Sequence, residues 1–264
     1  MSLPDSSYLM NVGKLRYIQS LCEPADRRNP DAVVGAFLSP GQRFACRVRG
    51  ALFRRRLRAN PFYHYLLART RHYDALFLEA VRACVSCIVN IGCGSDTRAY
   101  RFASLIKAKG ITVLEYDQPQ AIFAKRDMAA RRFPTAHVRY LPLELNDGFA
   151  AALNEVPPGP AFVMMEGVSP YIERTKFQAF LRLLRLRLAP GSVLAYDFKL
   201  HGVAPGFGHP NPFRLPPGRD AVAAYHRALG FELQRLEKSA ELTRRLIPHA
   251  SPLFEEDCLL CLTC

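Results

Sequence analysis

The spacing of hydrophobic positions along the chain changes near residue 86. Before that point apolar residues recur at helical spacing, as Leu66, Phe77 and Val81 do in the longest stretch. The helices predicted there are Ser7–Leu21, Pro30–Leu38, Gly41–Arg58 and Pro61–Ala83. We therefore interpret residues 1–85 as a helical N-terminal segment.

After residue 86, short apolar runs alternate with helical stretches. The runs predict strands at Ser86–Ile91, Thr112–Tyr116, His137–Leu141, Ala161–Met165 and Ser192–Asp197. The stretches predict helices at Thr97–Lys109, Gln118–Arg132, Phe149–Asn154, Glu173–Leu188 and Gly218–Leu229. This alternation is typical of βαβ units around a parallel sheet. Two further predicted strands, Gly230–Leu236 and Phe254–Leu262, suit a terminal antiparallel pair.

A glycine-containing turn lies between the first predicted strand and the next helix, with Gly92 and Gly94 on either side of Cys93. Glycines let the backbone approach a ligand, and a helix N-terminus favours a carboxylate or a phosphate. The dinucleotide-binding pattern would have a third glycine where Thr97 stands. The turn is therefore compatible with a nucleotide-type ligand. Whether it marks such a site depends on the residues at the ends of the other predicted strands.

Two acidic residues stand at the ends of the second and the fourth predicted strands. Asp117 stands 25 positions after Gly92, where folds of this type place the carboxylate that binds the ribose hydroxyls. The alternative role of Asp117 is a helix N-cap. Glu166 ends a fully apolar strand, so we expect it either to face a ligand or to pair with an arginine.

Composition excludes several classes of protein. Of the 264 residues 49% are hydrophobic and 22% charged, which gives one large or two small folded domains rather than disorder, collagen or coiled coil. No apolar run approaches the roughly 18 residues of a membrane span. The N-terminus lacks the features of a secretory signal, so we expect a cytoplasmic protein, either a monomer or a homodimer.

The net charge of +13 raises the question of a polyanionic partner, either nucleic acid or an anionic membrane. Only seven of the 36 basic residues are lysines, and the arginines are spread along nearly the whole chain, with one dense run at Arg54–Arg58. Such usage suits a GC-rich genome at least as well as a polyanion-binding face. We therefore expect neither a nucleic-acid nor a membrane partner.

The 8 cysteines are expected to be free thiols in a cytosolic chain. CxxC spacings occur at Cys84–Cys87 and in the run Cys258-Leu-Leu-Cys261-Leu-Thr-Cys264. The residues around them predict strands, so successive cysteines would face opposite sides of the sheet instead of converging on zinc. We predict buried thiols and no metal site.

Six segments, spread over most of the chain, share their residues with one known family. They are Ala68–Asp74, Asn90–Phe102, Glu115–Pro119, Pro142–Asn146, Glu166–Tyr171 and Asn211–Arg214. The run Gly94–Arg101 is much more specific than the two glycines alone. In these segments the chain resembles the leucine carboxyl methyltransferase family, and most closely its bacterial branch of natural-product and polyketide O-methyltransferases.

The resemblance implies an α/β, class I methyltransferase (Rossmann-like) fold: a seven-stranded, mostly parallel sheet with an antiparallel last strand and an N-terminal helical extension. The cofactor would be S-adenosyl-L-methionine (SAM), and the product S-adenosyl-L-homocysteine (SAH). Residues 86–264 would form the SAM-binding domain. Residues 1–85 would contribute to the SAM and acceptor site, and residues 199–217 would form an acceptor-side loop.

Five site residues follow from the matching motifs. The resemblance implies that Gly92 and Gly94 line the methionine and ribose part of SAM, and that Asp117 holds the ribose hydroxyls. It also implies that Glu166 binds near the methionine amino group, and Arg69 the methionine carboxylate. A guanidinium can grip a carboxylate through two parallel hydrogen bonds, which suits that last role.

Further cofactor residues come with departures from the family pattern. Glu144 and Leu145 would flank the adenine, although the family has Asp-Leu-Arg where this chain has Glu144-Leu145-Asn146. The family also uses a basic residue in its N-terminal segment. Either Lys14 or Arg16 could fill that place.

Methyl transfer from a sulfonium is an in-line displacement, and a carboxylate acceptor is already ionised at neutral pH. No histidine lies on the three strand-end motifs, which favours such an acceptor because a phenol or a carbon acid needs a base. We predict methylation of a small-molecule carboxylic acid of natural-product type. Alternatives are a phenolic or enolic oxygen, an α-keto-acid carbon, a non-catalytic SAM-binding partner, and a nucleic-acid methyltransferase.

The acceptor side is harder to assign from the sequence, and no catalytic base is predicted. The candidate acceptor-side residues are Arg71, His72, Tyr171, His201 and Arg214. The segment 201–217 is rich in glycine, proline and aromatic residues, which suits a lid or acceptor wall as well as a plain surface loop.

Overall fold

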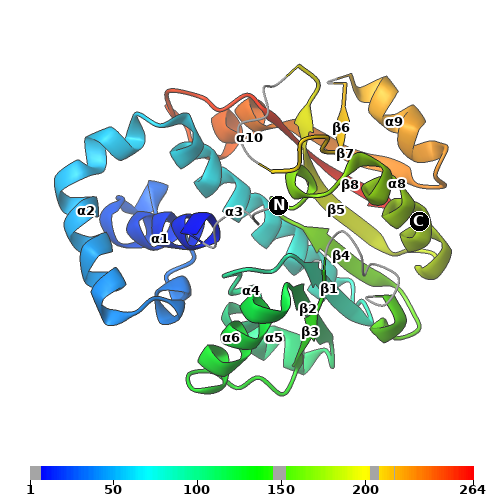
Figure 1. Cartoon of the computed structure of the whole chain (residues 1–264), viewed down its shortest axis with the longest axis horizontal. Helices are drawn as coiled ribbons and strands as arrows, with labels where there is room; N and C mark the ends of the chain where they lie inside the picture. The colour runs from blue at the N-terminus through cyan, green and yellow to red at the C-terminus, as the bar shows by residue number, and fades with distance from the viewer. Residues whose placement is uncertain (1–6, 145–152, 203–207, 217) are drawn as a thin grey trace.

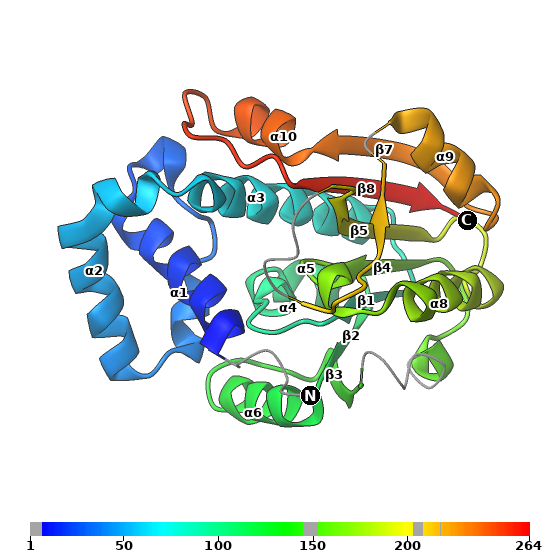
Figure 2. The same cartoon turned by 45° about the horizontal axis from the view of Figure 1, so that its top comes forward.

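A computed structural model of the chain describes residues 7–144, 153–202, 208–216 and 218–264. A central sheet crosses the molecule with helices on both faces, and α1 and α2 lie side by side at one edge (Figures 1 and 2). The N-terminal helices are α1 (Ser7–Cys22), α2 (Pro40–Arg58) and α3 (Pro61–Arg82). The later helices are α4 (Arg98–Arg101), α5 (Ala103–Ala108), α6 (Pro119–Ala130), α8 (Arg174–Arg187), α9 (Arg219–Arg227) and α10 (Ser239–Leu246).

The sheet has the strand order β3-β2-β1-β4-β5-β8-β7. Its strands are β1 (Cys87–Ile91), β2 (Thr112–Asp117), β3 (Val138–Pro142), β4 (Ala161–Met165), β5 (Val193–Leu200), β7 (Glu232–Lys238) and β8 (Asp257–Thr263). β8 is antiparallel to both neighbours, and the other pairings of this path are parallel. The predicted sheet with an antiparallel last strand is confirmed.

The sheet is buried on both faces, which explains why its strands are nearly continuous apolar runs. Side chains of alternate residues belong to different clusters: Val89 and Val163 to one face, Ile88 and Phe162 to the other. The first face is covered by α8 and α9. The second is covered by α3 to α6 and α10, so the N-terminal helix α3 shares a core with the sheet. The division into residues 1–85 and 86–264 remains a prediction.

The long helices begin where their sequence supplies a cap. In α2, Ser39 and Gln42 form a capping box with Pro40 in the first turn. In α3, the Asn60 side chain accepts a hydrogen bond from the Phe62 amide at 2.9 Å. Both starts lie within a residue of the predicted ones.

Three predicted elements differ in the structure. The predicted helix over residues 30–38 is a short 3-10 helix, η2 (Val33–Phe37), which Asp31 starts by accepting from the Val34 amide at 3.0 Å. The helix predicted over residues 97–109 is divided at Phe102, whose φ of −106° and ψ of 16° are not helical. The prediction over residues 149–154 falls mostly outside the described residues, which resume with the 3-10 helix η3 (Leu153–Glu155).

The segment predicted as an acceptor-side loop contains a strand of its own. β5 continues to Leu200, and β6 (Arg214–Leu215) pairs with its end in parallel. The sequence does not show this pairing, because two residues are too few to establish a period. No helix in the described part of the chain has the length and apolar character needed to cross a bilayer.

Candidate functional site

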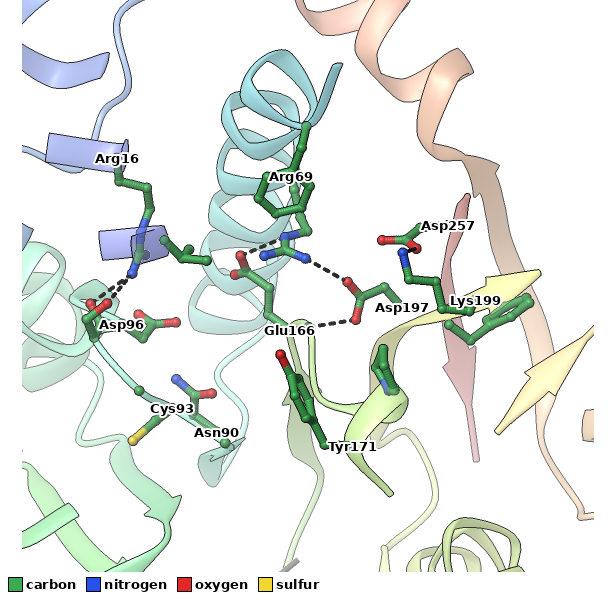
Figure 3. A pocket seen from close by; sticks show the side chains of 18 residues that line it. Arg16, Arg69, Asn90, Cys93, Asp96, Glu166, Tyr171, Asp197, Lys199 and Asp257 are labelled. Atoms are coloured by element: carbon green, nitrogen blue, oxygen red, sulfur yellow. Dashed lines mark hydrogen bonds and ion pairs between the residues drawn. The ribbon is translucent and has the colours of Figure 1, made fainter. Parts of the chain in front are cut away.

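The polar strand ends meet along one edge of the sheet. Because β2, β1, β4 and β5 are consecutive neighbours, Asp117, Gly92, Glu166 and Asp197 follow one another across this edge. A cavity lies beside them (Figure 3). It is lined by Val12, Arg16, Phe62, Arg69, Asn90, Gly92, Cys93, Gly94, Ser95, Asp96, Glu166, Gly167, Pro170, Tyr171, Asp197, Phe198, Lys199 and Asp257.

We call the part formed by Arg16, residues 92–96 and Glu166 the loop end of the cavity, and the part formed by residues 197–199 and Asp257 the strand end. Arg69 lies between the two ends and contacts both (Figure 3). Four of the seven predicted cofactor residues line this one cavity: Arg69, Gly92, Gly94 and Glu166.

The glycine turn follows β1 in a conformation that only glycine adopts easily. Gly92 has φ +68°, and a Cβ there would lie 2.5 Å from a methyl group of Val168. Its amide donates to the Tyr116 carbonyl at 2.8 Å, which ties the turn to the end of β2. Gly92 is therefore required for the close packing of the turn against the segment after β4.

Asp117 supports the same turn from behind. Its carboxylate accepts from the Gly94 amide at 2.6 Å and from the Gln118 amide at 2.8 Å. Burial raises the pKa of this carboxyl, and the two backbone hydrogen bonds oppose the rise. Asp117 is not among the cavity-lining residues, but a carboxylate oxygen that accepts one hydrogen bond can still accept a second.

Glu166 is held by two guanidinium groups. Its oxygens lie 3.1 Å from Arg69 Nε and 2.9 Å from an Arg98 Nη. Burial acts to raise the pKa of Glu166, but Arg98 and Arg69 outweigh it, so the pKa is lowered. Of the two roles predicted for Glu166, the pairing with arginine is observed; its place in the cavity lining is compatible with the ligand-facing role, which stays a prediction.

Arg98 is the residue that the motif comparison did not assign. Its fully buried guanidinium also contacts Asp96 and lies 2.7 Å from Asp74, on α3. The signature run Gly94–Arg101 therefore joins the glycine turn to α3 through buried ion pairs. The sequence signal for this network was the run itself, in which Asp96 and Arg98 are two residues apart. The sequence did not show that Arg98 also pairs with Asp74 and Glu166, which lie elsewhere in the chain.

The N-terminal basic residue at the cavity is Arg16. It donates to the Ser95 carbonyl at 3.0 Å and lies 3.1 Å from Asp31, while its buried Nε has no hydrogen-bond partner. Lys14, the alternative, lies near Cys46 on α2, where burial raises the pKa of the thiol and the charge of Lys14 acts to lower it, and Lys14 does not line the cavity. Of the two residues left open by the sequence, the structure brings Arg16 to the cavity.

The strand end was not predicted. Asp197 accepts from the Gly167 amide at 2.7 Å and lies 3.2 Å from Arg69. Lys199 lies 2.8 Å from Asp257, which the antiparallel pairing of β5 with β8 places opposite it. Asp197 is the last residue of the predicted strand Ser192–Asp197. A charged residue at that strand end was the sequence signal that could have marked it as a site residue.

The two ends differ in electrostatics. At the strand end, burial and the nearby charge of Asp257 raise the pKa of Asp197 to about 6, although Arg69 acts to lower it. At the loop end, Arg98 and Lys125 overcome burial and lower the pKa of Asp96. The lining residues carry four carboxylates and three cationic groups, so the cavity has a net negative charge in a chain of charge +13.

The candidate acceptor residues separate into four places. Tyr171, in the 3-10 helix η4 (Ser169–Tyr171), lines the cavity. Arg71 instead donates to the carbonyl oxygens of Asp26, Arg28 and Leu246. His72 is half-buried away from the cavity, near Glu237 and Arg245, and the partial removal of its ring from water lowers its pKa to about 4.

The other two acceptor candidates lie together elsewhere. His201 and Arg214 line a separate, open hollow, where a His201 ring nitrogen lies 3.0 Å from the Arg214 carbonyl oxygen. Of the residues predicted to flank an adenine, Glu144 is exposed and does not line the cavity. Leu145 lies outside the described residues.

The strand order, the glycine turn and the acidic strand ends define a Rossmann-like domain with a cavity at the carboxyl edge of the sheet, where folds of this type bind their ligands. The chain belongs to the leucine carboxyl methyltransferase family, whose model matches residues 23–185. This confirms the family that the sequence motifs resembled.

Two curated relatives carry the provisional name S-adenosyl-L-methionine-dependent methyltransferase. One, from Mycolicibacterium paratuberculosis, is 38% identical over 140 residues, which are 50% of this chain and 50% of that protein. The other, from Mycobacterium avium, is 32% identical over 173 residues, which are 64% of this chain and 52% of that protein. This chain spans about half the length of the curated relatives it matches.

A solved structure shares the fold. Magnesium protoporphyrin IX methyltransferase (ChlM) from Synechocystis PCC 6803, solved with bound SAH, is 12% identical, with a TM-score of 0.50. The match covers 79% of this chain and 91% of that one. At this identity the likeness concerns the fold alone, and it confirms the predicted class I methyltransferase fold.

Proposed function

We propose that this chain is a SAM-dependent methyltransferase that transfers a methyl group to a carboxylate oxygen of a small-molecule acid. One observation carries the proposal: the glycine turn, Glu166, Arg69 and Arg16 converge on one cavity at the carboxyl edge of the sheet. The family membership and the name given to the relatives support the same activity.

The charges of the cavity suit this cofactor. SAM carries a sulfonium, an ammonium and a carboxylate group, which together give it one net positive charge. The cavity offers a small excess of carboxylates and, at Arg16, a buried Nε that lacks a partner within the protein. A partnerless buried donor is costly unless a ligand satisfies it, so the donor set fits the cofactor.

Within this proposal, Arg69 and Arg16 bind the carboxylate of the methionine part, and Glu166 binds its ammonium. Gly92 and Gly94 let the backbone of the turn approach the ribose closely, and Asp117 accepts hydrogen bonds from the ribose hydroxyls. Glu144 and Leu145 remain proposals for the adenine end. Bound there, the cofactor supplies an electrophilic methyl group.

The chain's own contribution to the reaction is then to orient the acceptor and to exclude water. Tyr171, Phe62 and Phe198 line the cavity and give the acceptor an aromatic wall. Alignment of this kind contributes up to about 7–11 kcal/mol in well-oriented systems. The His201–Arg214 hollow is proposed for the distal part of a longer acceptor.

A carboxylate acceptor is favoured by what the cavity lacks. None of the described residues that line it is a histidine, and an ionised carboxylate needs no base. A second candidate, a phenolic or enolic oxygen, is favoured by Asp197, which lines the cavity and whose pKa is raised to about 6, suitable for accepting a proton.

Mass spectrometry distinguishes the two acceptors. The purified chain is incubated with SAM and a panel of aromatic and aliphatic acids, and any methylated product is then treated with mild base. Loss of the methyl group is expected, because an ester hydrolyses and an ether does not. A base-stable product would favour the second candidate, a phenolic or enolic oxygen, over the carboxylate. Failure to bind SAM or SAH in calorimetry would contradict both proposed acceptors.

A further inference from the structure

Helix α2 presents two opposed faces. Its inner face packs on α1 so closely that a Cβ at Gly50 would lie 2.4 Å from Cys22 Sγ. The outer face carries Phe44, Val48 and Leu52, spaced four residues apart and therefore aligned, with exposed fractions of 69%, 38% and 71%. Such a row of large apolar side chains in solvent indicates an interaction surface.

Arginines flank this row. Residues 40–58 contain seven arginines and neither aspartate nor glutamate. Arg54 donates to the Cys22 carbonyl and Arg58 pairs with Glu23, so these two hold α2 against the body. The other exposed arginines, called the flanking arginines, are Arg47 and Arg49 beside the row and Arg55 and Arg56 after it, beyond Phe53, whose φ of −115° and ψ of 17° are not helical.

Although the sequence led us to expect no membrane partner, we propose that the outer face of α2 binds an anionic membrane surface. Phe44, Val48 and Leu52 would enter the boundary between headgroups and acyl chains, and the flanking arginines would lie at the lipid phosphates. The helix occupies the outer edge of the molecule, with α1 between it and the sheet, so a flat surface can reach it (Figure 2). The chain would lie on the membrane and not span it.

Other occupants fit the surface less well. A nucleic acid could pair its phosphates with the arginines, but its backbone offers little apolar surface. The apolar row of α2 would therefore gain no apolar contacts from a nucleic acid. A second copy would bring the four flanking arginines of one chain against those of the other, a like-charge contact. A folded acidic protein would need a groove that fits the outer face of α2. A bilayer needs no such groove, because its lipids rearrange around the side chains that enter it.

Vesicle flotation with the full chain tests the proposal. We expect vesicles of phosphatidylcholine with about 30% phosphatidylserine to bind the chain at least about tenfold more tightly than phosphatidylcholine alone, with an affinity that falls as salt rises. Equal binding to both vesicles, or binding to neither, would overturn it.

Two variants locate the surface. The double variant Phe44→Ser/Leu52→Ser should lose about tenfold or more of the affinity. Arg55→Ala/Arg56→Ala should lose about 30-fold, since each arginine near an anionic surface contributes a factor of about five. These side chains are exposed, so Tm should stay close to that of the parent chain.

Leu186→Ser, on α8 and 82% exposed, is the matched control and should bind vesicles like the parent chain. Unchanged binding by both double variants would overturn the assignment to α2. Dimers that dissociate with Phe44→Ser/Leu52→Ser in the absence of vesicle binding would assign the face to a second copy. Capture of polyglutamate without vesicle binding would assign it to an acidic protein.

Discussion

The two ends of the cavity are built differently. At the loop end, Glu166 and Asp96 each contact the Arg98 guanidinium, and their pKa values are lowered despite burial. At the strand end, Asp197 and Asp257 are near neighbours, and the pKa of Asp197 is raised. The carboxylates of the loop end are thus each paired with a guanidinium group before any ligand binds, whereas the strand end retains an excess of negative charge.

This difference indicates a division of work. A buried network in which each carboxylate has a guanidinium partner fixes geometry, and fixed geometry is what cofactor binding requires. A carboxylate with a raised pKa is typical of functional sites, where an approaching ligand or proton changes its state. We therefore propose that the loop end holds the cofactor and that the strand end responds to the acceptor.

The largest effect is expected from Arg98→Ala, which breaks the loop end. Asp74, Asp96 and Glu166 would lose a shared buried cation, and loss of one partner of a buried ion pair costs about 3–5 kcal/mol in the free energy of unfolding. Urea denaturation measures this change.

Arg126→Ala is its control, because Arg126 and Asp127 form an exposed pair in which the arginine side chain is 51% exposed. Such pairs contribute about 0–1 kcal/mol. Equal costs for the two variants would mean that the Arg98 network does not support the fold.

Asp117→Ala should come next. The Gly94 amide would lose its acceptor, and the ribose hydroxyls would lose theirs, so SAH binding should weaken by about 1.5–3 kcal/mol in calorimetry. Asp127→Ala, at an exposed acid of α6, should leave the affinity unchanged. An unchanged affinity for Asp117→Ala would mean that another group holds the ribose.

Asp197→Asn tests the strand end. Because the pKa of Asp197 is raised to about 6, the folded chain keeps a proton on it where the unfolded chain has released one. The free energy of unfolding therefore falls as the pH rises from about 4 to about 6, on the order of 2 kcal/mol from this group. The asparagine variant lacks this slope.

Urea denaturation of both chains across this pH range measures the difference. The loss of the ion pair with Arg69 shifts the variant's curve but adds no slope there, since arginine stays charged. Parallel curves for the two chains would contradict the raised pKa.

Tyr171→Phe should have the smallest effect. One hydroxyl contributes about 0.5–1.5 kcal/mol, so KM for the acceptor should rise by about tenfold at most. SAH affinity should not change, because Tyr171 is proposed for the acceptor and not for the cofactor. A loss of SAH affinity would move Tyr171 to the cofactor side.

Much of the sheet could be predicted because burial on both faces leaves a strong local signal. The strand Ala161–Met165 is observed with the predicted bounds, and the other core strands shift by one to three residues at their ends. The division of the helix at Phe102 and the two-residue β6 could not be predicted, since neither breaks a hydrophobic period in the sequence.

The site was predictable only where one segment carried several of its residues. Gly92, Gly94 and Glu166 stand in contiguous motifs that follow strands, and all of them line the cavity. Arg71 and His72 stand in the same segment as Arg69, yet their side chains point elsewhere. On a helix, neighbouring residues are turned by about 100° from one another, so sharing a motif does not mean sharing a face.

The sequence by itself determined the family, the class of fold, and the glycine turn and Glu166 of the loop end, because local hydrophobic period and contiguous motifs encode them. Only the tertiary structure decided that Arg98 serves Asp74 and Glu166, that Arg16 and not Lys14 reaches the cavity, and that Lys199 meets Asp257. These pairs are far apart along the chain, and their distances depend on strand order and helix packing. The same packing decides that the apolar row of α2 faces outward.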